Sequence, residues 1–185
     1  MGVGVVSVDL CVFFEDKRLP TWEEWQCAIN ATGTDLYLQQ VSTRDHTGFL
    51  PMRLRGNECG FEYYFDPVEE EPDDVQKEIG DRDRVVTLVL HTGPPEDLQG
   101  ALLCAAVLTQ MTDGVYFDPQ SGEFARGNEV FDLIRRDDEE RRKRGKRAAE
   151  KDVGTTSRRC PNCGSPFPEY RKTCKACGFE MGRAL

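Results

Sequence analysis

Apolar and polar residues alternate along several short stretches of the chain, and this alternation predicts β-strands. The clearest case is the segment 60–66, in which Phe61, Tyr63 and Phe65 fall on one side of a strand and the residues between them fall on the other. The continuous apolar run in 84–91 instead indicates a central strand that is covered on both faces. Further strands are expected at residues 3–14, 36–41, 48–54 and 115–118.

Three other segments have the features of helices. Thr21 and Glu24 have the spacing of a capping box, apolar side chains follow at helical spacing, and Gly33 is a suitable stop. Residues 93–96 open a helix with a proline pair, and the following residues 98–111 are apolar on nearly all sides, so we expect this helix to lie deep against the sheet. A short helix is expected at 73–79.

These elements predict an α+β fold in which a mostly antiparallel sheet packs with helices. After Ile134 the apolar pattern stops, and acid-to-base pairs spaced four residues apart predict a long exposed helix from Glu129 to Asp152. We therefore divide the chain into an acidic α+β domain (1–134), a charged helical arm (135–156) and a small C-terminal module (157–185).

The C-terminal module contains two C-x-x-C hooks separated by ten residues. A tight turn at each hook would point both sulfurs inward, and four thiolates form the tetrahedral set that a structural Zn²⁺ takes. A pair of disulfides or free thiols is the alternative. The module resembles the zinc-ribbon family over about residues 158–181, and this resemblance implies one structural zinc ion. The four expected ligands are Cys160, Cys163, Cys174 and Cys177.

Charge is divided unevenly along the chain. Residues 1–134 carry 25 acidic and nine basic side chains, a formal net charge of −16. Residues 135–185 carry eight acidic and 15 basic side chains, a net charge of +7. The acidic part should repel nucleic acid and anionic membranes and attract a basic protein surface, whereas the basic part is expected to do the reverse.

Two charged stretches are therefore candidate binding surfaces. The acidic segment 69–74 is either a solvated loop or a docking surface for a basic protein, with exposed aromatic side chains as anchors. The basic stretch 141–147 is the best candidate footprint for nucleic acid. The candidate partner-binding residues are Glu69, Glu70, Glu71, Asp73, Asp74, Tyr64, Tyr116, Arg141, Arg142 and Arg144.

Sequence motifs of enzymes are sparse. The chain has no P-loop, no G-x-G-x-x-G after a strand, no H-E-x-x-H and no G-x-S-x-G. For His46 and His91 we favour positions on the surface or at a strand end over catalytic roles, and for Cys59 we favour a buried position at a strand edge. We therefore expect a protein without enzymatic activity. Four single cysteines are expected to be buried thiols: Cys11, Cys27, Cys59 and Cys104.

No segment has the character of a secretion signal or a membrane span. Residues 1–14 are apolar but short, no Lys or Arg precedes them, and they run directly into charged residues. No apolar run approaches the roughly 20 residues that a membrane helix needs. We therefore expect a cytoplasmic protein.

The layout of four segments, 19–25, 48–51, 60–64 and 113–119, resembles a known group of proteins. These are the small acidic α+β immunity proteins with which bacteria neutralise secreted or contact-delivered toxins. The resemblance implies a tight one-to-one complex with a cognate toxin, whose active site or target-binding face is blocked. The alternative is a nucleic-acid-associated regulator that uses the zinc ribbon and the basic arm.

Overall fold

A computed structural model describes residues 7–69, 71–91, 93–136, 139, 157–160, 162–168, 173 and 176. The chain forms two compact units, Met1–Arg136 and Asp137–Leu185. The first unit holds the sheet and its helices, and the described part of the second is a small β-hairpin.

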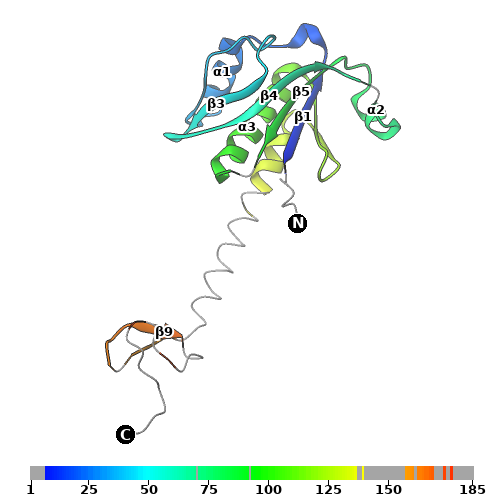
Figure 1. The fold of residues 1–185 in the computed structure, drawn as a ribbon. Coiled ribbons are helices and arrows are strands. Elements are labelled where there is room, and N and C mark those ends of the chain that lie inside the picture. Colours follow the sequence, from blue (N-terminus) through cyan, green and yellow to red (C-terminus); the bar gives the residue numbers. More distant parts are fainter. Residues whose placement is uncertain are drawn as a thin grey trace. The chain divides into compact units, whose positions relative to one another are not determined.

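The first unit is built on one seven-stranded antiparallel sheet, as the α+β prediction required. Its strand order is β2-β3-β4-β5-β1-β6-β7, so β1 and β5 lie near the middle and β2 forms one edge (Figure 1). The strands are β1 (Val8–Phe14), β2 (Leu36–Leu38), β3 (Gly48–Leu54), β4 (Asn57–Pro67), β5 (Arg84–Leu90), β6 (Val115–Asp118) and β7 (Glu123–Arg126).

The helices begin and end where the local sequence signals predict. Thr21 caps the first α-helix through a complete capping box, in which its hydroxyl accepts from the Glu24 amide and Glu24 accepts from the Thr21 amide. Asp113 ends the third α-helix in the left-handed conformation, with a φ of 51°. The helices are η1 (Asp16–Arg18), α1 (Trp22–Ala31), α2 (Asp73–Ile79) and α3 (Pro95–Thr112), and residues 129–136 are also helical.

One face of the sheet is closed by α1 and α3, with α3 behind the strands in Figure 1. The side chains between them form the main core, which includes Val12, Leu88 and Phe61. Small residues let α3 approach closely: at Gly100 an added Cβ would overlap the Met52 side chain of β3. The apolar character of α3 on nearly all sides is thus explained by the depth at which it is buried.

The opposite face of the sheet is covered over only part of its width. There, α2 places Val75 and Ile79 against Phe13 of β1, and these three form a second, smaller cluster. The partly buried Val85 of β5 packs against this cluster, whereas Val89 near the other end of β5 does not. The prediction that β5 is covered on both faces is therefore right only for its first residues.

The free edge of β2 is capped by a side chain of α1. The Gln26 amide nitrogen donates to the Leu36 carbonyl at 2.9 Å, and its oxygen accepts from the Leu38 amide at 2.8 Å. Both interactions are buried. Gln26 thus occupies the position that the backbone of a further strand would take.

Several expectations need correction or lie outside the described part of the chain. Strand β7 was not predicted. Cys27 is exposed on α1 rather than buried, because it faces away from the core side chains Trp25 and Ile29. Most of the predicted helix 129–152 falls outside the described residues. Within the described ranges, no helix combines the length and apolarity needed to cross a bilayer.

Candidate functional site

The uncovered part of the second face lies over β2, β3 and β4, and we call it the open half of the sheet. Strand register places these residues side by side: Tyr37 pairs with Arg53, and Arg53 pairs with Glu58. The next rows pair Pro51 with Gly60 and Phe49 with Glu62. The outward residues of the open half are Tyr37, Phe49, Pro51, Arg53, Glu58, Gly60, Glu62 and Tyr64.

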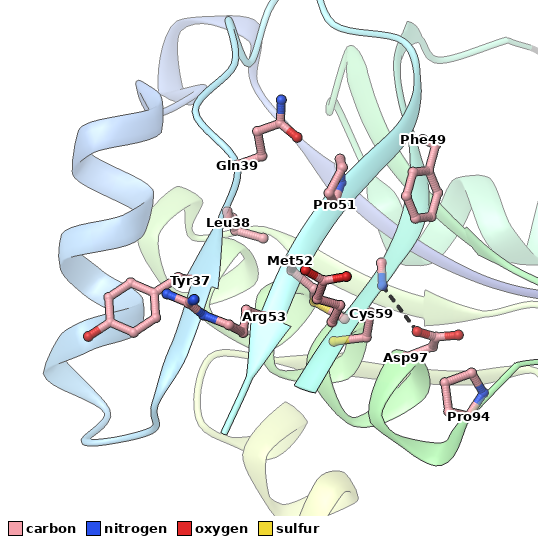
Figure 2. A pocket seen from close by; sticks show the side chains of 12 residues that line it. Tyr37, Leu38, Gln39, Phe49, Pro51, Met52, Arg53, Cys59, Pro94 and Asp97 are labelled. Carbon is pink, nitrogen blue, oxygen red and sulfur yellow. Dashed lines mark hydrogen bonds between the residues drawn. The ribbon is translucent and has the colours of Figure 1, made fainter. Parts of the chain in front are cut away.

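Two large hydrophobic side chains are exposed in the described part of the chain, and both lie on the open half. Phe49 is 60% exposed and Tyr37 is 50% exposed. They lie on opposite sides of a groove of about 620 Å³ (Figure 2). The groove is lined by Tyr37, Leu38, Gln39, Phe49, Pro51, Met52, Arg53, Glu58, Cys59, Gly60, Pro94 and Asp97.

The position of Phe49 depends on a glycine in the neighbouring strand. A Cβ atom at Gly60 would overlap the Phe49 ring and lie 2.9 Å from the Leu50 carbonyl oxygen. Because Gly60 has no side chain, the ring can lie over the backbone of β4. The register that brings the two residues together is set by the two-residue turn between β3 and β4, where Arg55 and Gly56 both have positive φ.

The groove continues past the end of β5. Pairing between β4 and β5 stops at Glu62 and Val89, so the earlier residues of β4 have no neighbouring strand on that side. Asp97 in the first turn of α3 compensates, because its carboxylate accepts from the Gly60 amide at 3.0 Å. The start of α3 thereby forms one wall of the groove (Figure 2).

A polar network borders the groove beside Phe49. The two carboxylate oxygens of Glu62 accept from the Tyr64 hydroxyl at 2.7 Å and meet His91 Nε2 at 3.2 Å. These hydrogen bonds, with Tyr64 the larger influence, lower the pKa of Glu62, so this carboxylate is ionised at neutral pH. At the other end of the groove the Arg53 guanidinium lies 5.8 Å from the centre of the Tyr37 ring.

The remaining candidate nucleophile and base do not form a recognisable catalytic arrangement with these groups. Burial raises the pKa of the Cys59 thiol against a hydrogen bond with the Leu54 backbone, and the charges of Asp97 and Glu96 raise it further. His46 packs its ring 6.1 Å from that of Tyr63 and is not one of the residues that line the groove.

The acidic segment predicted as a docking surface runs into the first turn of α2 and contributes no residue to the groove lining. Glu69, Asp73 and Asp74 are exposed, and Glu71 is half-buried. Asp73 and Asp74 form the first turn of α2, where negative charge favours the helix. Their acidity thus has a local structural role. Glu70 falls outside the described residues.

The predicted aromatic anchors have different outcomes. Tyr64 is half-buried on the open half, beside the groove. Tyr116 is only 3% exposed and belongs to the main core, so its prediction as a surface anchor is wrong. Adjacent residues of a strand point to opposite faces, and β6 turns Tyr116 towards the main core and Phe117 towards α2. Arg141, Arg142 and Arg144 lie outside the described residues.

Tyr37 and Phe49 were not among the predicted site residues, although the sequence contained a signal for them. Leu36 and Leu38 flank Tyr37, and Leu50, Met52 and Leu54 alternate after Phe49. This alternation directs both aromatic side chains away from the core.

In the second unit, β8 (Ser157–Arg159) and β9 (Pro166–Pro168) pair as an antiparallel hairpin around the first cysteine hook. The Cys160 amide donates to the Ser165 carbonyl at 2.9 Å, and the Gly164 amide donates to the Cys160 carbonyl at 2.8 Å. Gly164, which follows the hook, has a φ of +72°, a conformation that glycine adopts without strain. Cys174 and Cys177 lie outside the described residues, and within those residues no three His, Cys, Asp or Glu side chains gather as a metal site.

Comparison with known proteins adds no assignment to this geometry. No family model matches the chain, and neither the curated proteins nor the solved structures contain a significant match.

Proposed function

We propose that the first unit is a protein-binding module that docks a basic protein partner on the open half of its sheet. The observation that carries this proposal is the exposure of Tyr37 and Phe49 on the same groove. Exposed aromatic side chains that cluster on one face are typical anchors of protein interfaces. The net charge of −16 on residues 1–134 adds long-range attraction for a basic partner.

The class of module that we propose is an immunity protein that neutralises a toxin without being an enzyme itself. An acidic field accelerates capture of a basic toxin, and aromatic anchors then supply affinity at close range. The acidic segment lies outside the groove lining, and this fits the two proposed roles. The electric field of the acidic residues acts at a distance, whereas an aromatic anchor acts only in contact.

We further propose that the second unit holds one structural Zn²⁺ through Cys160, Cys163, Cys174 and Cys177. Support comes from the hairpin at the first hook, whose tight turn and positive-φ glycine suit a pair of thiolate ligands. Metal analysis of the purified full chain should give one zinc per chain, and replacing any one of the four cysteines with Ser should lower that value. A zinc content near zero in freshly prepared protein would contradict the proposal.

The protein-binding proposal is tested by affinity capture from the native cell with the full chain, followed by mass spectrometry and quantification of nucleic acid. One protein should be recovered in a one-to-one ratio, and Phe49→Ser should reduce its recovery. Lys77→Ser, an exposed change on α2, is the matched control and should leave recovery unchanged. Recovery of nucleic acid instead of a stoichiometric protein would refute the proposal and favour the regulator alternative.

A further inference from the structure

The groove has a floor almost without side chains and walls that are aromatic and acidic. Pro51 and Gly60 form its central row, and neither offers a long side chain. Phe49 lies over Gly60 and still keeps most of its surface exposed. A shallow apolar floor of this kind accepts an extended segment with one inserted side chain more readily than a bulky convex surface.

The carboxylates of the open half are arranged around this floor. Glu58 and Glu62 lie on the same side of β4, two positions before and after Gly60, and thus about 13 Å apart along the strand. Glu62 is the direct cross-strand neighbour of Phe49. Asp97 adds a third carboxylate at the wall.

The one cation among the lining residues is already engaged. Arg53 lies over the Tyr37 ring and is the cross-strand neighbour of Glu58. The ring of Phe49, in contrast, has no cation of this chain over it among the described cation–ring contacts. Phe49 beside Glu62 therefore presents an aromatic face next to an ionised carboxylate, which is the combination that attracts a guanidinium or ammonium group.

We infer that the groove receives an arginine or lysine side chain from an extended segment of a basic protein partner. The cation stacks on Phe49 and pairs with the Glu62 carboxylate, which has acceptor positions beyond those that face Tyr64 and His91. The flanking residues of the segment lie along Pro51 and Gly60 towards Glu58. This inference rests on the proposed protein-binding function and specifies which part of the partner enters the groove.

The test uses the isotope-labelled full chain and three capped peptides of nine residues, alike except for the central residue. That residue is arginine, its uncharged isostere citrulline, or glutamate. In an NMR titration, the arginine peptide should change the chemical shifts of the backbone amides of Phe49, Arg53 and Gly60. The citrulline peptide should bind about fivefold more weakly, because the exposed cation–π contact and the exposed ion pair each contribute roughly twofold or more. Equal binding of the arginine and citrulline peptides would overturn the inference.

Variants locate the effect. Phe49→Leu keeps an apolar side chain but removes the ring face, and Glu62→Gln removes the charge. Each variant leaves one of the two cation contacts, so the preference for arginine over citrulline should fall from about fivefold to about twofold. Asp74→Asn removes the same charge outside the groove and should leave the preference intact. If Asp74→Asn lowered the preference for arginine as much as Glu62→Gln does, the preference would reflect general attraction to an acidic protein. The proposed cation site at Phe49 and Glu62 would then be refuted.

The two proposals fail in different ways. Suppose that the full chain captures a protein, that the Phe49→Ser variant captures less of it, and that the arginine and citrulline peptides bind equally. The protein-binding function then stands, and the cation site at Phe49 and Glu62 is rejected. If the arginine peptide binds the groove selectively but no stoichiometric protein is captured, the cation site at Phe49 and Glu62 stands and the proposed function is rejected.

Discussion

The two halves of one sheet face differ in whether a helix covers them. Over β1, β5 and β6, α2 covers the sheet with Val75 and Ile79, and Phe117 stacks on Phe124 beneath it at a ring distance of 4.4 Å. Over β2, β3 and β4, no helix of the described chain covers the outward side chains, and Tyr37 and Phe49 remain exposed there.

The comparison separates apolar surface that stabilises the fold from apolar surface that is available for binding. Burial of Ile79 removes apolar area from water within the chain itself, so its contribution appears as folding stability. Phe49 keeps 60% of its surface in water, so the corresponding free energy is released only if another molecule covers it.

The largest expected effect concerns the covered half. Ile79→Ala should destabilise the fold by about 2–5 kcal/mol, since the side chain is fully buried. Because α2 belongs to a small separate cluster, part of this loss should appear as local opening, with faster amide exchange in α2 than in β5. Denaturant unfolding and hydrogen exchange measure the two quantities.

Ile29→Ala is the matched control, because Ile29 is also fully buried but packs in the main core. It should lower global stability without selective opening of α2. Selective opening in the control, or its absence in Ile79→Ala, would break the distinction between the two clusters.

On the open half, Phe49→Ser should weaken partner binding by about 2 kcal/mol or roughly 30-fold, as expected of an aromatic anchor. Its effect on unfolding should stay below about 1 kcal/mol because the ring is mostly exposed. Calorimetric titration with the captured partner and denaturant unfolding give both values. A large loss of folding stability without a loss of binding affinity would instead show that Phe49 stabilises the fold and is not a binding anchor.

The pH dependence of the unfolding free energy tests the burial of Cys11 in the covered half. Burial raises the pKa of the Cys11 thiol to about 11, against a hydrogen bond with Thr87. A raised folded-state pKa favours the neutral thiol, so this stabilisation is complete below a pH of about 9 and is lost as pH rises towards 11. Unfolding free energy should therefore fall less steeply between pH 9 and about 11 in Cys11→Ala than in the unmodified chain.

The smallest effect is expected from the acidic segment. Joint replacement of Glu69, Asp73 and Asp74 with amides should slow association with a basic partner a few-fold at low salt and leave dissociation nearly unchanged. Stopped-flow or surface-based kinetics at two salt concentrations measure this. A marked increase in the dissociation rate would instead show that the segment touches the partner directly.

Local signals predicted most of the fold. The bounds of α2 and β6 follow from residues inside or next to these elements, such as the left-handed Asp113 before β6. Strand β7 escaped prediction because only Phe124 and Ala125 are apolar in it, and its position depends on pairing with β6. Such pairing is a long-range property that no short window of sequence contains.

The candidate site was harder to predict than the fold for a related reason. Alternation shows that Phe49 and Tyr37 point away from Leu50 and Leu36, but it does not show whether a helix covers them. That depends on where α2 packs, which is decided by the fit of Val75 and Ile79 to Phe13. The wrong assignment of Tyr116 has the same origin, because a four-residue strand does not reveal which face is the core.

The Gln26 amide that caps β2 has a consequence for how copies of this protein coexist at high concentration. An uncapped strand edge is a template on which other chains can polymerise into β-rich fibres. With its carbonyl and amide groups already occupied at Leu36 and Leu38, β2 offers no such template. Gln26 thus hinders edge-to-edge pairing of β2 with a second copy of the chain, although the exposed Tyr37 lies on the same strand.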